Sequence, residues 1–120
     1  MENEGFHNRD GLIWYDGIMV DWRDASLHVL THALHYASCV FEGERVYAQE
    51  IFKLREHTNR LINSANIMGF EIPYTPDEID AACIEACEAN GIIDGYVRPV
   101  AWRGSEMMGV SAQETTVHLA

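Results

Sequence analysis

Two helix-like segments, at residues 55–68 and 76–90, interrupt a chain whose other segments have the pattern of short strands and turns. A helix or a sheet must bury its apolar side against another element, so two helices between groups of strands limit the possible layers. This order predicts an α+β fold, with a mostly antiparallel sheet and two main helices packed on it.

Both helices have clear boundaries. The first is expected to end at Gly69, and its buried positions recur every three or four residues. They are His57, Leu61, Ser64, Ala65 and Met68. The second begins with Thr75 as N-cap, Pro76 in the first helical position and Glu78 completing a capping box, and Gly91 follows its end. Its expected buried positions are Ile79, Ala82, Cys83, Ala86 and Cys87.

The strand-like segments lie on both sides of the helices. Asp16-Gly17 separates two short apolar runs, and this dipeptide tolerates the positive φ angles of a tight hairpin turn. Residues 40–47 predict a strand whose hairpin partner is 49–54. Residues 96–102 predict another, in which Pro99 indicates an edge or an interrupted ladder, and residues 115–120 begin a last strand.

Charge limits the possible partners. The 8 basic and 19 acidic residues give a net charge of −11, which disfavours nucleic acids and anionic membranes but leaves room for a phosphate in a local positive pocket. No signal peptide and no apolar run of membrane-spanning length is visible, so we expect a cytoplasmic protein. Residues 1–11 are expected to be a flexible segment, and 12–120 one domain.

The three cysteines, Cys39, Cys83 and Cys87, are an odd number. This favours reduced thiols that act as small core residues, as in cytosolic proteins. Cys83 and Cys87 lie four residues apart on a predicted helix, and a metal pair there is the less favoured alternative.

Arg60 lies at the edge of the apolar stripe of the first helix. Its stem can pack on the protein while the planar guanidinium binds a phosphate with two hydrogen bonds. The alternative is a surface arginine paired with Glu56, four residues away. Spacing alone favours the surface pair.

Five separated motifs change that interpretation. They are Tyr15-Asp16-Gly17 with Met19-Val20, the run 32–36, Val40-Phe41-Glu42-Gly43, the heptad 55–61 and Tyr96-Val97-Arg98-Pro99. In this order they resemble the N-terminal domain of the branched-chain amino acid aminotransferases, which are fold-type IV, class-IV enzymes dependent on pyridoxal 5'-phosphate (PLP). Residues 104–110 extend the resemblance, which covers nearly the whole chain from Ile13 onward.

The resemblance implies a set of roles. Arg60 would bind the PLP phosphate, Phe41 would line the pocket for the substrate's aliphatic side chain, and Tyr96 and Arg98 would face the substrate. Arg98 would bind the side-chain carboxylate of glutamate or 2-oxoglutarate. Two further residues would reach into a neighbouring subunit's pocket, which implies a homodimer or larger homo-oligomer acting on amino acids and 2-oxo acids. They are Tyr36 and Val110.

Lysine is nearly absent. These enzymes need a lysine that bonds covalently to PLP, and the single lysine, Lys53, does not match the position of that residue in the family. Alternation between Phe52 and Leu54 indicates that Lys53 faces solvent. We therefore expect this chain to be the N-terminal domain of a longer enzyme and to be inactive alone, with no catalytic residue of its own.

A histidine cluster offers a different function. His28, His32 and His35 would share one face if the segment were helical, and Glu42 could complete a zinc site. Histidines hydrogen-bonded within the domain, with no metal, are the favoured interpretation. Glu42 and Glu44 share a strand face, and a solvated face is expected for them.

Other functions remain open at this point. Within the same fold, the alternatives are a D-amino acid transaminase, an (R)-amine transaminase or an aminodeoxychorismate lyase. The strand Tyr96-Val97-Arg98-Pro99 favours the branched-chain type. From another class, the alternative is a non-enzymatic domain that binds metal or forms dimers.

Overall fold

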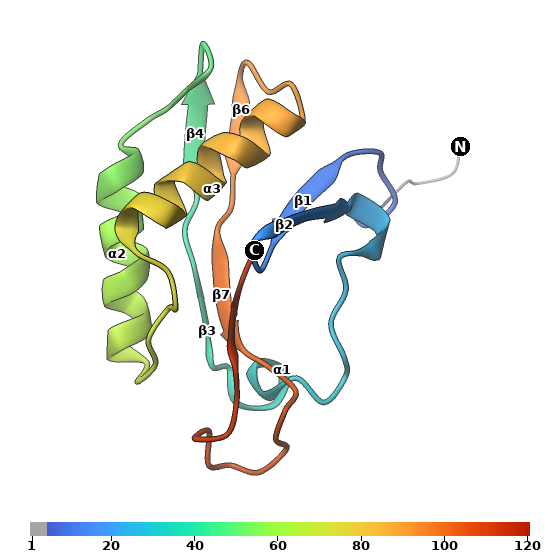
Figure 1. Cartoon of the computed structure of the whole chain (residues 1–120), viewed down its shortest axis with the longest axis vertical. Coiled ribbons are helices and arrows are strands. Elements are labelled where there is room, and N and C mark those ends of the chain that lie inside the picture. The colour runs from blue at the N-terminus through green and yellow to red at the C-terminus, as the bar shows by residue number, and fades with distance from the viewer. Residues whose placement is uncertain (1–4) are drawn as a thin grey trace.

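The computed structural model describes residues 5–120, and within that range it contains three small antiparallel sheets and two long helices (Figure 1). The strands are β1 Leu12–Tyr15, β2 Ile18–Asp21, β3 Cys39–Phe41, β4 Glu44–Tyr47, β5 Glu50–Ile51, β6 Gly95–Val97, β7 Val100–Arg103 and β8 Val117–Leu119. The helical elements are η1 Trp22–Asp24, α1 His32–Tyr36, α2 Leu54–Ile67 and α3 Pro76–Ala89. The predicted α+β class is confirmed.

The N-terminal hairpin forms at Asp16-Gly17, as predicted. Both residues have positive φ, 47° and 95°, and the register of β1 and β2 places Tyr15 opposite Ile18. The expected flexible segment, residues 1–11, lies partly outside the described range. From residue 5 onward it runs beside η1, where Arg23 pairs with Asp10 at 2.8 Å, and its flexibility stays a prediction.

Two long segments form a single antiparallel ribbon that is interrupted in the middle. The segment 40–47 divides into β3 and β4, and the segment 96–102 divides into β6 and β7. The register is the same on both sides of the break, with Phe41 opposite Val100 and Glu44 opposite Val97. Pro99 has no N–H to donate to the ladder, which explains the break. The N–H of Glu42 still donates to the carbonyl of Pro99, at 3.0 Å, and bridges it.

Helix α2 follows the predicted span but not every predicted buried position. Leu61 and Ala65 are fully buried, whereas Met68 is 46% exposed. Met68 is the C-cap, one residue past the last helical turn. Thr58, near the N-terminal end of the helix, is buried although it was not among the predicted positions, and its hydroxyl donates to Asp80 of α3 at 2.5 Å. An apolar pattern does not reveal such a polar contact between helices.

The capping box of α3 is present. Thr75 Oγ1 accepts from the N–H of Glu78 at 3.2 Å, and Glu78 Oε1 accepts from the N–H of Thr75 at 2.9 Å. Thr75→Ala is expected to lower the free energy of unfolding by about 1 kcal/mol, because the N–H of Glu78 loses its side-chain acceptor. Urea denaturation would measure it. Thr75→Ser keeps the hydroxyl and should stay close to wild type; equal losses for both substitutions would contradict the cap's contribution.

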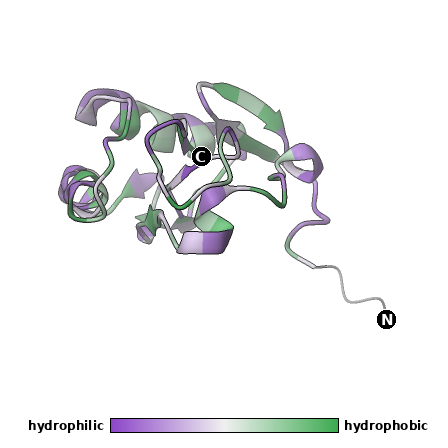
Figure 2. Ribbon diagram, turned by 90° about the horizontal axis from the view of Figure 1, so that it is seen from below, coloured by the Kyte–Doolittle hydropathy of each residue, from purple (hydrophilic) through white to green (hydrophobic). Residues whose placement is uncertain are grey.

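The core lies between the helices and the inner face of the sheets. Its fully or nearly fully buried apolar residues are Val46, Leu61, Ala65, Phe70, Ile79, Ala101 and Leu119. Leu119 belongs to β8, which pairs with β7 and confirms the predicted last strand. Along both helices, hydrophilic and hydrophobic positions alternate in bands, as amphipathic helices require (Figure 2).

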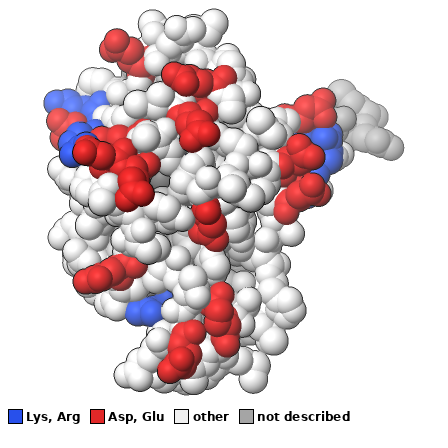
Figure 3. Space-filling view, viewed as in Figure 1, with Lys and Arg blue, Asp and Glu red and all other residues white. Residues whose placement is uncertain are grey.

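Acidic groups predominate on the face seen in Figure 3. None of the helices between residues 5 and 120 combines the length and apolar composition needed to cross a membrane. All three cysteines are free thiols. Cys83 and Cys87 are buried, as predicted for core residues, but the prediction is wrong for Cys39, which is exposed because its side chain alternates away from buried Val40.

Candidate functional site

The outer face of the interrupted ribbon carries aromatic and cationic side chains. Side-chain alternation continues through the break, so residues 40, 42, 44 and 46 are buried and their neighbours 41, 45 and 47 are exposed. On the facing segment, Tyr96 and Arg98 are exposed as well, and Tyr96 is the register partner of Arg45. The outward side chains are Phe41, Arg45, Tyr47, Tyr96 and Arg98.

Three of the predicted substrate residues contact one another there. The guanidinium of Arg98 lies over the ring of Phe41, 4.6 Å from its centroid, and 5.4 Å from the centroid of Tyr96. Arg98 Nε and Nη2 donate to the hydroxyl of Tyr96 at 3.1 and 3.0 Å. Phe41 and Tyr96 remain 56% and 47% exposed, so neither is an ordinary core residue. Together they form an open apolar surface with one positive group.

Gly43 allows this packing. A Cβ atom at residue 43 would lie 2.4 Å from the hydroxyl oxygen of Tyr96 and 3.0 Å from two of its ring carbons. The phenol therefore covers the backbone at Gly43, in space that any larger residue would occupy. The glycine of the Phe41-Glu42-Gly43 motif is thus a close-approach glycine.

Arg60 approaches the same ribbon from α2, where it pairs with Glu42 and not with Glu56. Arg60 Nε and Nη2 donate to the two carboxylate oxygens of Glu42, both at 2.7 Å. His57 Nδ1 lies 2.9 Å from Glu42 Oε1. Hydrogen bonds from Arg60 lower the pKa of Glu42, burial opposes this effect, and His57 adds to the lowering. Glu42 is therefore an ionised carboxylate at neutral pH.

The expectation of a solvated face for Glu42 and Glu44 is wrong. Their side chains are 5% and 0% exposed, because the inner face of the ribbon packs on α2 and α3. Among the described residues, neither oxygen of Glu44 has a hydrogen-bond partner. The thiol of Cys83, a weak donor, lies beside it without reaching hydrogen-bond geometry. Burial raises the pKa of Glu44 to about 7, and the negative charges of Glu42 and Asp80 add to the increase.

Tyr36 and Val110 lie near each other at a different part of the molecule, around α1. The Tyr36 hydroxyl donates to the carbonyl of Met108 at 3.4 Å, and His32 Nε2 lies 3.3 Å from the carbonyl oxygen of Val110. The rings of His32 and Tyr36 are 4.5 Å apart. Tyr36 and Val110 are 42% and 78% exposed.

The three histidines do not share one helical face, the alternative that a zinc site would need, because His28 precedes α1. Each histidine is hydrogen-bonded within the domain: His28 to Leu30, His32 to Ser38 and His35 to Val29. Glu42 is bound to Arg60 instead. Nowhere in residues 5–120 do three or more metal-binding side chains gather around one point.

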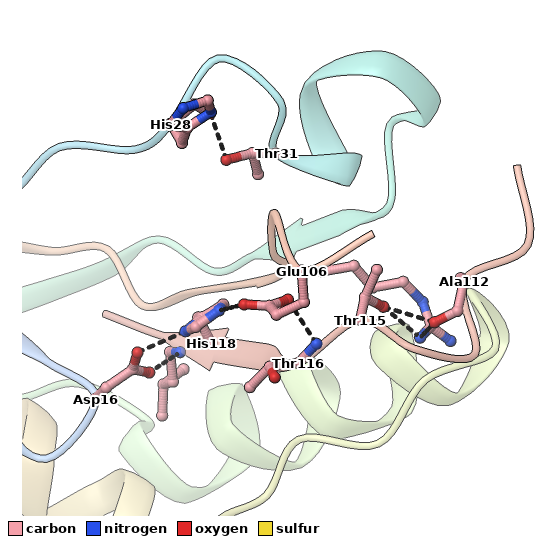
Figure 4. Close-up of polar contacts among 10 residues, drawn as sticks. Asp16, His28, Thr31, Glu106, Ala112, Thr115, Thr116 and His118 are labelled. Atoms are coloured by element: carbon pink, nitrogen blue, oxygen red, sulfur yellow. Dashed lines mark hydrogen bonds and ion pairs between the residues drawn. The ribbon is translucent and has the colours of Figure 1, made fainter. Parts of the chain in front are cut away.

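The loop that carries Val110 is fixed at its base by His118 (Figure 4). His118 Nδ1 lies 2.6 Å from Asp16 Oδ2, and Nε2 lies 3.1 Å from Glu106 Oε2. Burial opposes a charge on this imidazole, but the hydrogen bonds to Asp16 and Glu106 raise the pKa of His118. Glu106 also accepts from the N–H of Thr116 at 2.7 Å. The sequence pattern did not indicate this cluster, because its members are far apart along the chain.

Lys53 is exposed, as predicted, at the N-terminus of α2. It has a positive φ of 59°, and its ammonium lies 5.9 Å from the ring centroid of Phe52. No contact joins it to Arg60, Arg98 or Tyr96 within the described part of the chain.

Comparisons with known proteins agree on one family. Residues 39–120 match the family described as amino-transferase class IV. The chain is 50% identical over 116 residues to the branched-chain-amino-acid aminotransferase of Pseudomonas aeruginosa, covering 93% of this chain and 38% of the relative. It is 42% identical over 103 residues to that of Escherichia coli K12, covering 82% and 33%.

Solved structures show the same likeness. The branched-chain amino acid aminotransferase from Escherichia coli superposes with a TM-score of 0.85 at 39% identity, covering 93% of this chain and 40% of that one. Another branched-chain amino acid aminotransferase, complexed with N-(5'-phosphopyridoxyl)-L-glutamate, gives 0.84 at 40% identity, with the same coverage. The chain spans less than half the length of the curated relatives it matches.

Proposed function

Because the chain belongs to the class IV aminotransferase family, we propose that it is part of a PLP-dependent enzyme that moves the amino group between branched-chain L-amino acids and 2-oxoglutarate. Leucine, isoleucine and valine are the proposed amino donors. The relatives that share up to half of its residues bear the name of this activity. The observation that carries the proposal is that two groups of residues meet at the same ribbon. One is Arg60 paired with Glu42, and the other is the cluster of Phe41, Tyr96 and Arg98.

The residues at Arg60 fit a phosphate. Glu42 occupies one edge of the guanidinium, and the Arg60 side chain is still 66% exposed. An arginine has five N–H donors, so three of them remain available to phosphate oxygens. The planar fork suits two parallel hydrogen bonds to a phosphate dianion. Arg60 would hold PLP by this group, and bound PLP would withdraw electrons from the substrate's reacting carbon.

The outer cluster suits a pocket that accepts two kinds of side chain. An aliphatic side chain would pack on Phe41 and Tyr96. The carboxylate of glutamate or 2-oxoglutarate would bind Arg98, which Tyr96 holds in place through its hydroxyl. A surface with apolar rings and one guanidinium thus serves both substrates of a transamination, in turn.

Three further points belong to the same proposal. Tyr36 and Val110 would reach the pocket of a second subunit, which makes the enzyme a dimer. Lys53 would take no part in the chemistry, so the chain alone would be inactive. A cytoplasmic location is proposed as well.

A hybrid protein tests the function. This chain replaces the matching 116 residues of the Pseudomonas aeruginosa relative, and the hybrid is assayed with L-leucine and 2-oxoglutarate and, separately, with D-alanine. We expect transamination of L-leucine and at least about a hundredfold lower rate with D-alanine, because D-alanine has the opposite configuration at Cα and lacks the branched side chain that the apolar surface would bind.

The control is the same hybrid carrying Arg60→Gln. It should need much more added PLP to reach its full rate. A hybrid that prefers D-alanine would support a D-amino acid transaminase instead. Full activity of the Arg60→Gln hybrid without added PLP would remove Arg60 from the cofactor site.

A further inference from the structure

We propose that Glu42 is the positioning residue that orients the guanidinium of Arg60 toward the cofactor phosphate, and that His57 holds Glu42 in place. This inference rests on the proposed function, because it takes Arg60 as the phosphate-binding group. It adds a role for a buried carboxylate that does not itself touch the phosphate.

The difference in burial between Glu42 and Arg60 supports the proposal that Glu42 orients Arg60, and not the reverse. The Glu42 side chain is 5% exposed, whereas that of Arg60 is 66% exposed. An exposed arginine on a helix has several rotatable bonds, and its guanidinium populates many positions unless a partner holds it. Two parallel hydrogen bonds of 2.7 Å to a fixed carboxylate select one of them.

The pairing also selects which edge of Arg60 faces outward. Nε and one hydrogen of Nη2 are used by Glu42. The edge formed by Nη1 and the second hydrogen of Nη2 stays open, and this edge offers two parallel donors to phosphate oxygens. Glu42 thus presents Arg60 in the orientation that a phosphate needs.

Glu42 is itself held from two directions. Its Oε1 faces His57 Nδ1 at 2.9 Å, and its backbone N–H donates to the carbonyl of Pro99 at 3.0 Å. The His57 side chain is 19% exposed, so this contact is largely shielded from water. Because Phe41 directly precedes Glu42 in the chain and points outward, one segment positions both the phosphate-binding guanidinium and the wall of the proposed substrate cluster.

Charge and orientation predict opposite results when Glu42 is changed. By Coulomb's law alone, removing a negative charge beside Arg60 strengthens the binding of a phosphate dianion. In Glu42→Gln the amide oxygen can accept one hydrogen bond but the amide NH2 cannot accept the second, so the guanidinium is held less firmly and that binding weakens. A decrease in phosphate affinity on removing this charge therefore identifies orientation as the role of Glu42.

The experiment compares pyridoxine 5'-phosphate with pyridoxine, which differ only in the phosphate and have no aldehyde to react with Lys53. Binding to the 120-residue chain is followed by NMR titration, and the ratio of the two dissociation constants measures the contribution of the phosphate. We expect the wild-type chain to prefer the phosphate ester by about tenfold or more. Glu42→Gln should reduce this preference to about twofold or less.

Two further variants separate the possible causes. Glu85→Gln removes an equal charge from an exposed position on α3 and should leave the preference unchanged. His57→Phe removes only the support of Glu42 and should lower the preference by about threefold. In the NMR spectrum, the Nε–H signal of Arg60 should be sharp in wild type and averaged over several side-chain conformations in Glu42→Gln. The amide spectrum shows whether each variant is folded, and His57→Phe keeps the proposal testable if Glu42→Gln unfolds.

The outcomes distinguish the two proposals. If Arg60→Gln abolishes the preference but Glu42→Gln and His57→Phe keep or increase it, Glu42 is no positioning residue and the phosphate role of Arg60 stands. If the wild-type chain shows no preference, the phosphate role of Arg60 fails and the role of Glu42 fails with it.

Discussion

Replacing Glu44 with glutamine is expected to raise the free energy of unfolding by about 3 kcal/mol at pH 8, and to change it little near pH 4. Burial raises the pKa of Glu44 from its ordinary value of 4.5 to about 7. The folded chain therefore keeps this proton over a pH range in which the unfolded chain has released it.

The sign follows from proton binding. Between about pH 4.5 and pH 7 the folded state binds more protons at residue 44 than the unfolded state, so stability decreases as the pH rises. Above pH 7 the folded chain must ionise a carboxylate whose oxygens have no hydrogen-bond partner among the described residues. Glutamine has nearly the same shape as glutamate and carries no charge. The free energy of unfolding of Glu44→Gln therefore does not decrease as this carboxylate ionises.

Urea denaturation followed by tryptophan fluorescence, at several pH values from about 4 to 8, measures the effect. The difference between the two proteins is informative, because it cancels the titration of all other groups. Glu50→Gln removes an exposed carboxylate from β5 and should give a curve parallel to wild type. A constant difference between Glu44→Gln and wild type at every pH would show that folding does not raise the pKa of Glu44.

Gly43→Ala is expected to reduce the transamination rate of the hybrid by about a hundredfold, because displacement of a substrate-positioning group by about 1 Å has that effect. The new methyl group would lie 2.4 Å from the hydroxyl oxygen of Tyr96. The Tyr96 side chain is 47% exposed and can swing outward, so the stability of the protein should change little. The phenol hydroxyl would then leave Arg98, whose guanidinium lies over Phe41.

The matched variants are Tyr96→Phe and the double substitution. Tyr96→Phe removes the oxygen that lies closest to the new methyl group but keeps the two ring carbons at 3.0 Å, so the two effects should be less than additive: the double variant is expected to lose less activity than the two single losses together predict. The measurements are steady-state rates and melting temperatures of four hybrids: the unsubstituted one, the two single variants and the double variant. Additive losses would mean that Gly43 acts through some other contact.

The local elements of the fold were predictable from the sequence. Asp16-Gly17 and the Thr75 capping box depend on contacts between residues close in the chain, and both formed as predicted. The interrupted ribbon was foreseen only in part. Pro99 indicated a break in its own strand, but the matching break at Glu42-Gly43 arises from the facing strand.

The site was predictable where a residue's surroundings come from its own strand. Tyr96 and Arg98 were expected on one face, and they contact each other there. Glu42 and Glu44 were placed on a common face correctly, but alternation alone does not say which face the helices cover. Two acidic residues suggested solvent, whereas the apolar residues at 40 and 46 on the same face marked the buried side. Partners from distant segments, such as Asp16, His118 and Glu106, needed the tertiary structure.

The two faces of the interrupted ribbon separate the positions that build the core from the positions proposed to contact the substrate. Its inward positions, including Val40 and Val46, belong to the core, while the outward positions Phe41, Tyr96 and Arg98 contribute little buried area. Under the proposed function, substrate preference can diverge by exchange of outward residues, with the inward ones unchanged. For enzyme engineering, a library restricted to these outward positions should retain a high proportion of folded variants.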